Sequence, residues 1–407
     1  MSQVIIIGGG LAGLALANVL KHHNVPYKVY ERDTCPDGRS QGWSMLAHFC
    51  LPYLKEAIDP EKYAKVAKWS SVNPYEPWLF EMATINGKTG EVYVKSTHED
   101  DDVPNDALRI NRGRFRYWLM DGIDIEWNKE FSELIEHEDG VTVKFKDGTE
   151  ARGGVVVGAD GVRSRVCQHR VGKQVFWENT QLNPVHLLAA VRRMTAEQRA
   201  QYDALSRTLM LSFGGDDVRS YTLISCVTDV DKTREDAYEV QWGISCINSD
   251  EPIYETDHER LAQAKSWASR SMSGLIRDTV VDTPAGTPVV RMALYERPPS
   301  ILEGTLALHP RVTLIGDAAH TMVPYRGEGG NHGILDGVKL GLLLAEVYKD
   351  KSTITAALET FEKEMIERGT EAVNASHEAS LLFHAKSPEG GIAVAKQIGQ
   401  RYAKDKQ

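Results

Sequence analysis

Three features are scarce in this sequence of 407 residues, and each scarcity excludes a class of protein. The five cysteines are scattered without the spacing of a zinc site or a redox pair, which predicts reduced thiols in a cytoplasmic protein with no metal centre. No apolar run approaches the roughly 20 residues that span a bilayer, and no basic segment precedes the first apolar run as in a signal peptide. Positive charge is scarce as well, since 47 lysines and arginines stand against 57 acidic residues. The resulting net charge of −10 disfavours binding to nucleic acid.

The N-terminal segment carries the pattern of a dinucleotide-binding βαβ unit. An apolar run at 4–7 leads into Gly8-Gly9-Gly10-Leu11-Ala12-Gly13, a helical pattern follows, and a second strand-like run ends in Glu31. In such a unit Gly8 permits the tight turn, Gly10 lets the backbone approach a pyrophosphate, and Gly13 lets helix and strand pack closely. The helix N-terminus would bind the phosphates, and Glu31 would bind a ribose without a 2′-phosphate. The motif fits NAD and FAD equally, and a glycine-rich turn without a ligand is the alternative.

Segments farther along the chain are of three kinds. Apolar runs at 155–160 and 312–317 end in Asp160 and Asp317 and predict buried strands of the same nucleotide-binding sheet. A mostly antiparallel sheet is predicted by strand-like runs at 185–192, 208–213, 220–228 and 238–247, and a hairpin by the alternation at 141–146. Helical patterns cover 257–277, 332–349 and 353–384. The antiparallel region is therefore an insertion in a discontinuous nucleotide-binding domain.

Two further motifs complete a set. The second is Gly158-Ala159-Asp160-Gly161-Val162-Arg163-Ser164, and the third is Gly316-Asp317-Ala318-Ala319-His320, followed by Pro324, Gly327, Gly329 and Asn331. In this order and spacing the three motifs resemble those of the group A flavoprotein monooxygenases, the para-hydroxybenzoate hydroxylase-like family, over nearly the whole chain.

The resemblance implies an α/β fold in three parts. A discontinuous, Rossmann-like FAD-binding domain would comprise residues 1–72, 103–175 and 285–350. An inserted, mostly antiparallel β-sheet domain that binds substrate would comprise 73–102 and 176–284, and a C-terminal helical segment would comprise 351–407.

The third motif has a physical interpretation of its own. Asp317 ends a strand at the carboxyl edge of the sheet, where it could hold ribityl hydroxyls or else cap a helix. The glycine-rich stretch 327–331 opens a helix whose N–H groups would stabilise negative charge, and in the family this helix end faces the flavin N1–C2=O edge. Pro324 resembles the family proline beside the flavin, although a turn before a helix also explains it.

The remaining cofactor residues come from the second motif and from arginines. In the family the Asp160 position serves both FAD and the nicotinamide nucleotide, whereas its spacing alone predicts a cap of residues 162–166. Arg112 resembles an arginine that relatives aim at FAD, with a surface arginine as the alternative, and Arg39 matches a loop arginine beside FAD. The expected cofactor contacts are Gly8, Gly10, Leu11, Ala12, Gly13, Glu31, Arg32, Arg39, Gln41, Gly42, Arg112, Asp160, Asp317, Gly327, Gly329, Gly330 and Asn331.

The resemblance also implies a reaction. Similar proteins reduce FAD with NADPH or NADH, and the reduced flavin takes up O₂ as a C4a-hydroperoxide that delivers one oxygen atom to an aromatic or electron-rich small molecule. The flavin carries this chemistry, so the lack of a catalytic triad in the sequence fits. A flavin-dependent oxidoreductase or dehydrogenase of the same fold without oxygen insertion, and a non-catalytic binding protein, are the alternatives. We expect a monomer or homodimer.

The substrate should lie over the flavin and against the inserted sheet. Strand residues that could contact it are Arg192, Met210, Phe213, Tyr221 and Trp242. Arg192 and Tyr221 could bind or deprotonate a phenol or an acid, and with Pro324 they are the expected catalytic residues. Alternating strand residues of this kind equally fit a core or a solvent-facing position.

Overall fold

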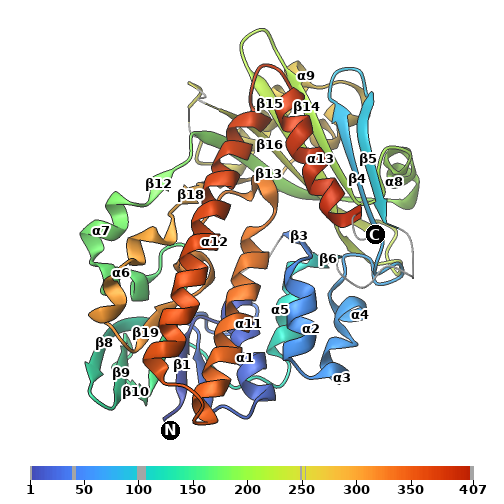
Figure 1. The fold of residues 1–407 in the computed structure, drawn as a ribbon. Helices are drawn as coiled ribbons and strands as arrows, with labels where there is room; N and C mark the ends of the chain where they lie inside the picture. The colour runs from blue at the N-terminus through green and yellow to red at the C-terminus, as the bar shows by residue number, and fades with distance from the viewer. Residues whose placement is uncertain (1, 39–42, 99–106, 248–249, 253, 404–407) are drawn as a thin grey trace.

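Two β-sheets organise the chain, and the helices lie around them (Figure 1). The structure, a computed structural model, describes residues 2–38, 43–98, 107–247, 250–252 and 254–403. The first sheet has five parallel strands in the order β19-β11-β1-β2-β7, with bounds Val312–Leu314, Val155–Gly158, Val4–Ile7, Tyr27–Tyr30 and Ile125–Glu126. This confirms the predicted Rossmann-like sheet, including the two strands that lead to Asp160 and Asp317.

The second sheet has seven strands in the order β17-β13-β16-β15-β14-β4-β5. Their bounds are Val290–Met292, Val185–Met194, Tyr238–Ile247, Ser220–Val230, Leu209–Gly215, Phe80–Asn86 and Val92–His98. Neighbouring strands run antiparallel except β14 and β4, which run parallel. The mostly antiparallel sheet is thus confirmed, whereas the domain boundaries stay a prediction; β17 continues this sheet past residue 284.

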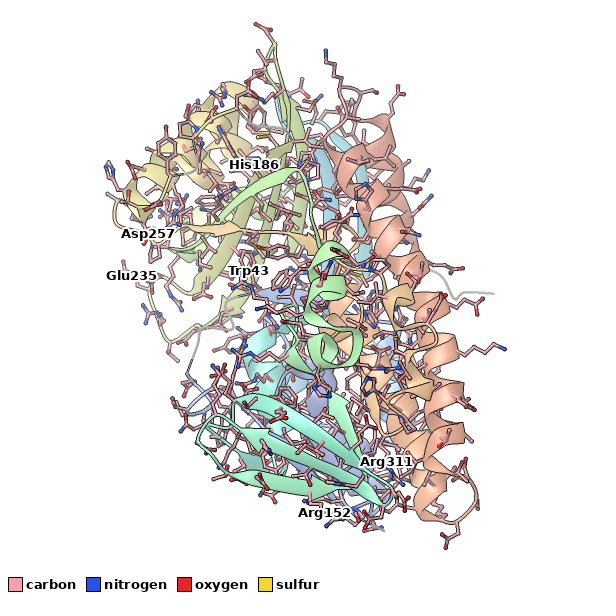
Figure 2. The ribbon with its side chains drawn as sticks, turned by 90° about the vertical axis from the view of Figure 1, so that its left-hand side faces the viewer. Trp43, Arg152, His186, Glu235, Asp257 and Arg311 are labelled. Carbon is pink, nitrogen blue, oxygen red and sulfur yellow. The ribbon has the colours of Figure 1, made fainter. Side chains whose placement is uncertain are left out.

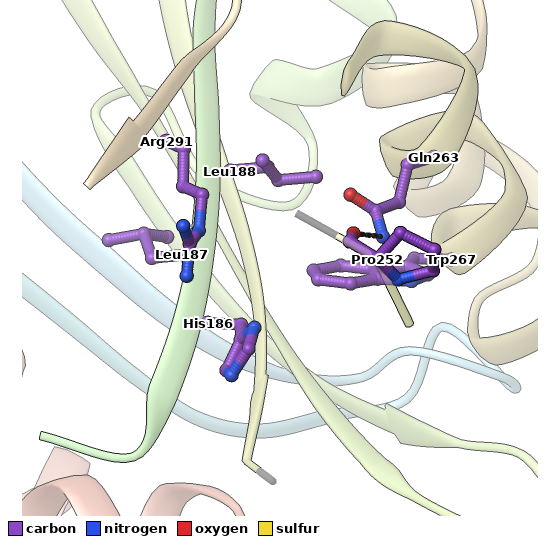
Figure 3. Close-up of a pocket in the computed structure, with 7 residues that line it drawn as sticks. All are labelled: His186, Leu187, Leu188, Pro252, Gln263, Trp267 and Arg291. Atoms are coloured by element: carbon purple, nitrogen blue, oxygen red, sulfur yellow. Dashed lines mark hydrogen bonds between the residues drawn. The ribbon is translucent and has the colours of Figure 1, made fainter. Parts of the chain in front are cut away.

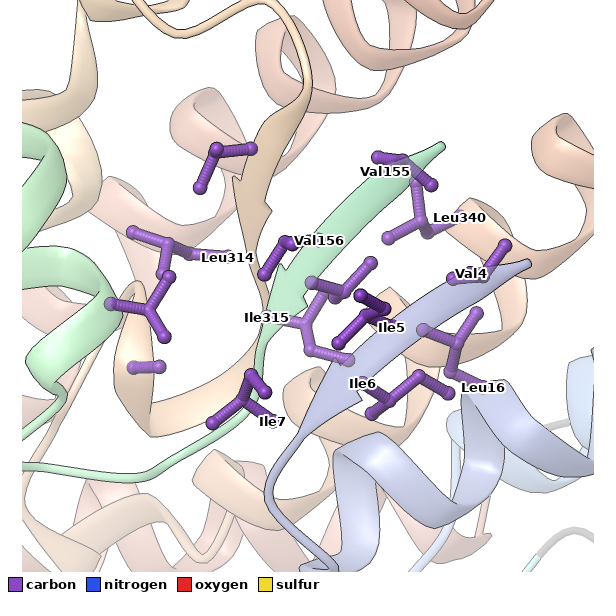
Figure 4. Close-up of a cluster of buried hydrophobic side chains, with 14 of the residues drawn as sticks. Val4, Ile5, Ile6, Ile7, Leu16, Val155, Val156, Leu314, Ile315 and Leu340 are labelled. Atoms are coloured by element: carbon purple, nitrogen blue, oxygen red, sulfur yellow. The ribbon is translucent and has the colours of Figure 1, made fainter. Parts of the chain in front are cut away.

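The core of the parallel sheet explains the apolar composition of its strands. All four residues of β1 are buried, as is typical of a parallel strand covered on both faces. They form one apolar cluster with Leu16 of α1 (Leu11–His22), Leu340 of α11 (Gly329–Tyr348) and Val156 of β11 (Figure 4). The three-stranded sheet of β8 (Phe131–His137), β9 (Gly140–Phe145) and β10 (Glu150–Gly153) joins the same cluster and contains the predicted hairpin.

The two faces of the seven-stranded sheet belong to different apolar clusters. Tyr221 and Leu223 of β15 pack in a cluster with α9 (Asp257–Ser271) and α10 (Gly274–Val281). Cys226 of the same strand packs in a second cluster, which includes Leu46 of β3 (Ser44–Ala47) and Tyr325 beyond β19. Since β3 and the chain after β19 adjoin the parallel sheet, this second cluster marks the face turned toward it.

The C-terminal helices differ in part from the predicted ones. The helix α12 (Ile354–Phe383) runs from the parallel sheet to the seven-stranded sheet (Figure 1). The single helix expected at 257–277 is instead α9 and α10, and the Ser273 N–H at the break donates to the Gly87 carbonyl. The helix α13 (Glu389–Ala403) has no counterpart of its own among the expected helices, because its glycines are poor helix formers. Packing compensates, since a Cβ on Gly391 would lie 2.7 Å from the Phe213 ring.

Short elements connect the two sheets. β3 pairs with β6 (Leu108–Asn111), and β12 (Gln181–Leu182) pairs with β18 (Tyr295–Glu296). The connecting helices are α2 (Cys50–Ala57), α3 (Pro60–Tyr63), α4 (Val66–Ser70), α5 (Arg112–Met120), α6 (Arg165–Val171), α7 (Lys173–Glu178) and α8 (Ala196–Asp203). In the part of the chain that the structure describes, no helix combines the length and apolarity needed to cross a membrane.

Three glycines let α11 approach α1 unusually closely. They stand four residues apart on α11, so they share one face of the helix. A Cβ on Gly337 would lie 2.6 Å from the Ala12 carbonyl oxygen, one on Gly341 would lie 2.7 Å from Val19, and one on Gly333 would lie 3.3 Å from the Gly316 Cα. This face therefore fixes the N-terminal ends of α1 and α11 next to each other.

We predict that Gly337→Ala lowers the free energy of unfolding by about 1–3 kcal/mol. The new methyl group would meet backbone atoms of α1, which cannot rotate away, and this outweighs the gain of about 1 kcal/mol in helix propensity. Gly329→Ala is the control, because its Cβ would approach only the flexible Met322 side chain, at 3.4 Å. Urea unfolding measures both variants, and equal stabilities would contradict the close approach of the two helices.

Candidate functional site

Four parallel strands end along one edge of the first sheet, and the residues of all three motifs follow those ends. Ile7 of β1 pairs in register with Tyr30 of β2 and with Gly158 of β11, and Gly158 pairs with Leu314 of β19. The glycine loop, Glu31, Asp160 and Asp317 therefore emerge side by side. The carboxyl edge of an open α/β sheet is where such folds bind ligands.

The glycine loop has three glycines with three different roles. Gly8 has φ of +117°, and a Cβ there would lie 2.3 Å from the Ala159 carbonyl oxygen. A Cβ on Gly13 would lie 2.2 Å from the Gly8 carbonyl oxygen, so Gly13 is needed for the helix to pack on the loop. A Cβ on Gly10 would meet nothing within 4 Å, and no described side chain caps α1, whose first turn holds no acid. The loop thus leaves space and backbone N–H groups for a phosphate.

Glu31 and Arg116 hold the loop in place. The buried carboxylate of Glu31 accepts the Gly9 N–H through Oε2 (2.6 Å) and the Asp33 N–H through Oε1 (3.0 Å). The buried guanidinium of Arg116 donates to the carbonyls of Gly9 and Pro36, both at 2.8 Å. Arg116 is not among the site residues predicted from the sequence, and its one local signal is its place beside Phe115 on the buried side of α5.

The two strand-end acids have different surroundings. Asp160 accepts the Ser164 hydroxyl and the N–H groups of Arg165 (2.7 Å) and Val166 (3.3 Å) at the start of α6, whose N-cap is Ser164. Removal from water raises the pKa of this carboxyl. Asp317 is exposed in the 3₁₀ turn Gly316–Ala318, and its carboxylate has no hydrogen-bond partner among the described residues. Asp317 is therefore the acid that can bind a ligand without losing a contact.

A buried carboxylate organises the third motif. Asp336 of α11 accepts the Gly316 N–H (2.8 Å) and the His320 Nε2–H (2.6 Å) through Oδ2, and the Arg368 Nη2–H of α12 (2.7 Å) through Oδ1. Burial disfavours its charge, but His320 and Arg368 outweigh burial and hold the pKa of Asp336 well below its usual range. His320 is thus a scaffold residue whose Nε2 is engaged, and not a free base.

His332 completes this cluster as a neutral ring. Its Nδ1 accepts a hydrogen bond from Arg368 Nη1 at 2.8 Å. Burial, followed by the charges of His320 and Arg368, lowers the pKa of His332 to about 3. The imidazole therefore stays uncharged at physiological pH.

The N-terminus of α11 presents backbone groups to the same edge. Gly327 has φ of +66°, and Pro324 and Gly327 are both exposed in the turn before the helix. A Cβ on Gly330 would lie 2.6 Å from Met45 of β3. The buried Asn331 amide donates to the Leu46 carbonyl (2.8 Å) and accepts the His48 N–H (2.8 Å), so its side chain joins α11 to β3 and leaves its backbone for a cofactor.

The expected arginine contacts are placed only in part. Arg39, Gln41 and Gly42 lie outside the described residues. Arg112 begins α5 with an exposed side chain, and its N–H donates to the Trp43 carbonyl at 3.1 Å. Arg32 is exposed directly after Glu31. Figure 2 shows Trp43 where the seven-stranded sheet meets the rest of the molecule.

The structure corrects the expected substrate contacts. Arg192 points to the face covered by α9 and α10, where its Nη1 donates to the carbonyls of Asp278 (3.0 Å) and Thr279 (3.3 Å). Tyr221 lies on the same face and accepts a hydrogen bond from Arg270 Nε at 3.1 Å. Met210 and Trp242 are on this face too, whereas Phe213 is on the other. Arg192 and Tyr221 thus have structural partners and are turned away from the parallel sheet.

A small pocket on the seven-stranded sheet does not alter this picture (Figure 3). It has room for about one water molecule, far less than a substrate-sized pocket needs. No motif residue lines it; its lining residues are His186, Leu187, Leu188, Pro252, Gln263, Trp267 and Arg291.

Comparisons with known proteins agree with this geometry. The family model described as FAD binding domain matches residues 307–376, which include the third motif. The FAD-dependent monooxygenase phnB of Penicillium herquei is 31% identical over 392 residues, which cover 94% of this chain and 91% of that protein. Two solved structures share the fold at lower identity.

The first is HpxO of Klebsiella pneumoniae complexed with FAD and uric acid, which aligns with a TM-score of 0.70 at 17% identity and covers 98% of this chain and 93% of that chain. The second is 2,6-dihydroxypyridine-3-hydroxylase of Arthrobacter nicotinovorans, with a TM-score of 0.69 at 20% identity and coverage of 95% and 94%.

We predict that Asp317→Asn weakens FAD retention by about tenfold or more, because a charge-assisted hydrogen bond to the cofactor is lost. The melting temperature of the apoprotein should not fall, because the substitution removes no hydrogen bond to a described residue. Asp160→Ala is the contrasting variant, since loss of its hydrogen bonds to the Arg165 and Val166 N–H groups should cost about 1 kcal/mol of stability. FAD titration and thermal unfolding give the two readouts. Unchanged FAD affinity in Asp317→Asn would remove this residue from the site.

We also predict that the protein loses stability as the pH falls below 6.5, in part through His332. Its pKa is lowered from 6.5 to about 3 in the folded chain, so the unfolded chain takes up the proton first. The stabilising contribution is complete above pH 6.5 and decreases as the pH falls toward 3, by up to a few kcal/mol. We expect the free energy of unfolding, measured with a chemical denaturant between pH 7 and pH 4, to depend less steeply on pH in His332→Asn than in the wild type. The same pH dependence of the free energy of unfolding in both proteins would show that His332 does not titrate in this way.

Proposed function

The chain belongs to the FAD-dependent monooxygenases, and from that premise we propose that it uses NADH or NADPH and O₂ to insert one oxygen atom into an aromatic or otherwise electron-rich small molecule. The family follows from the relative that is 31% identical across 94% of this chain. The observation that carries the proposal is the carboxyl edge of the parallel sheet, where an uncapped helix, the open space at Gly10 and the available Asp317 carboxylate meet.

The residues at this edge fit FAD in a definite order. The Glu31 carboxylate would hold the adenosine ribose, and the N–H groups at the start of α1 would hold the pyrophosphate. Asp317 would hold ribityl hydroxyls, and the N-terminus of α11 would face the isoalloxazine ring. Bound FAD supplies the redox chemistry and the activation of O₂.

The chain's own residues would bind, orient and shield the reactants. The helix dipole at the start of α11 would stabilise negative charge on the ring beside it, with Pro324 exposed next to that helix end. The facing side of the seven-stranded sheet is lined by Leu209, Leu211 and Cys226, which would exclude water from the reacting atoms. A substrate bound between this face and the flavin would be oriented by polar groups on the sheet.

The substrate class is supported by the proteins that share the fold. One solved structure holds uric acid, and another protein hydroxylates 2,6-dihydroxypyridine, both of which are electron-rich rings with ionisable hydroxyl or lactam groups. We extend this chemistry to the present chain as an electron-rich ring, without adopting either compound.

The test is NADH and NADPH oxidation in air with a panel of phenols, aromatic acids, indoles and polycyclic aromatics, followed by mass spectrometry of the products. We expect one nucleotide to be consumed faster with at least one compound, and the product to gain one oxygen atom. A product that only loses hydrogen would instead indicate a dehydrogenase of the same fold. Bound FAD without any stimulated oxidation across the panel would contradict the proposed substrate class.

A further inference from the structure

The side chain of Arg297 lies between the second and the third motif. Arg297 directly follows β18, and its N–H donates to the Thr321 carbonyl at 3.0 Å. Its guanidinium donates from Nη1 to the Val162 carbonyl at 3.1 Å, and from Nη2 to the carbonyls of Asp317 and Ala318 at 3.0 and 3.2 Å. One planar group therefore joins the loop after β11 to the 3₁₀ turn after β19.

The guanidinium of Arg297 is buried among neutral groups. The residue is 0% exposed, and no carboxylate among the described residues pairs with it. Its Cζ lies 4.1 Å from the centre of the Phe176 ring of α7, and Nη1 also donates to the Thr180 hydroxyl at 3.2 Å. Burial lowers the pKa of Arg297, because removal from water disfavours the charged form. A buried cation without a counter-charge lowers stability, so its presence here requires a reason beyond packing.

Other buried arginines have different surroundings. Arg170 and Arg199 each pair with a carboxylate. Arg192 donates to main-chain carbonyls, as Arg297 does, but these carbonyls belong to α10 on the face of the seven-stranded sheet that is turned away from the parallel sheet. Arg297 is distinguished by its acceptors, which belong to two motifs at the carboxyl edge of the parallel sheet.

The turn that carries Asp317 is held at both ends. The Gly316 N–H at its start donates to Asp336 Oδ2 at 2.8 Å, and the carbonyls of Asp317 and Ala318 accept hydrogen bonds from Arg297. The Asp317 carboxylate is exposed and has no hydrogen bond to a described residue. Its direction is therefore set by the main chain of the turn, which Asp336 and Arg297 fix.

The contact with Val162 connects this turn to the glycine loop. Val162 stands three residues after Ala159, whose N–H donates to the Ile7 carbonyl at 2.7 Å. The Ale159 carbonyl oxygen leaves no space for a Cβ on Gly8, because the two atoms would be 2.3 Å apart. The guanidinium of Arg297 thus fixes Asp317 relative to the glycine loop. A ligand that contacts both positions binds more tightly when their separation is fixed in advance.

We propose that Arg297 is a positioning residue, which holds Asp317 at the distance from the glycine loop that FAD retention requires. The inference rests on the proposed function, because that function places the pyrophosphate at the start of α1 and the ribityl chain at Asp317. Since Arg297 has no exposed surface, it acts through Asp317 and does not touch the cofactor. A lysine cannot replace it, because a compact ammonium group lacks the planar fork that reaches both motifs.

The test is a double-mutant cycle on FAD affinity, measured by titrating the full-length apoprotein with FAD. Arg297→Lys should weaken FAD binding about tenfold in the wild-type background. In an Asp317→Ala background the same substitution should weaken it by no more than about twofold, because the carboxylate that Arg297 positions is already absent. In a Gly10→Ala background it should again weaken FAD binding about tenfold, since Gly10 and Asp317 would contact different parts of FAD.

Arg192→Lys is the matched control, because Arg192 is also buried and also donates to two main-chain carbonyls. Both Arg192→Lys and Arg297→Lys should lower the melting temperature of the apoprotein, since each loses buried hydrogen bonds. Arg192→Lys should nevertheless bind FAD as the wild type does. A loss of stability alone therefore does not reproduce the expected loss of FAD affinity.

Phe176→Leu is a second variant that keeps the proposal testable if Arg297→Lys does not fold. It removes the ring beside the guanidinium and leaves the hydrogen bonds of Arg297 in place. We expect Phe176→Leu to weaken FAD binding about threefold, and to have no further effect in the Asp317→Ala background.

The proposal is overturned if Arg297→Lys binds FAD as tightly as the wild type, if its loss of affinity is equally large in the Asp317→Ala background, or if Arg192→Lys loses as much affinity. A wild type that binds no FAD would overturn the proposed function instead. Failure of every compound in the substrate panel would concern the proposed function alone, because FAD titration involves no substrate.

Discussion

The buried carboxylate of Asp336 is the interaction on which the site depends. It joins the backbone after β19, His320 and Arg368 of α12 to the middle of α11. Because α11 also approaches α1 through the glycine face at Gly337, this one charge fixes the third motif relative to the glycine loop. A buried charge is stable only when its hydrogen bonds are satisfied, so the arrangement has little freedom to shift.

That rigid frame explains how polar groups are divided between structure and ligand binding. The side chains of Asp160 and Asn331 bind backbone groups and position the edge of the sheet. Asp317 makes no side-chain hydrogen bond to a described residue, and the space around Gly10 is open, as expected of positions that bind a ligand. A ligand-binding role is expected where a polar group of the protein lacks hydrogen-bond partners within the protein.

The sequence predicts the cofactor side of the molecule better than the substrate side. The glycine spacing at 8–13 and the acids after two apolar runs are local patterns, and their strands do form one parallel sheet. The contacts of Asp336 could not be predicted, because Arg368 comes from a distant helix. Strand alternation distinguishes the two faces of a sheet but does not say which face another part of the chain covers. The burial of Arg192 against α10 could therefore not be predicted. The helix α13 packs with Phe213 through Gly391, Val394 and Ala395, and local helix propensity does not encode such a tertiary contact.

The measurement that tests this account most directly is a crystal structure of the protein with FAD bound. The account predicts the pyrophosphate on the N–H groups that follow Gly10, the ribityl chain at Asp317, and the isoalloxazine ring between the start of α11 and the face of the seven-stranded sheet that holds Leu209 and Cys226. A flavin bound elsewhere, or an isoalloxazine ring separated from that face by protein, would contradict it.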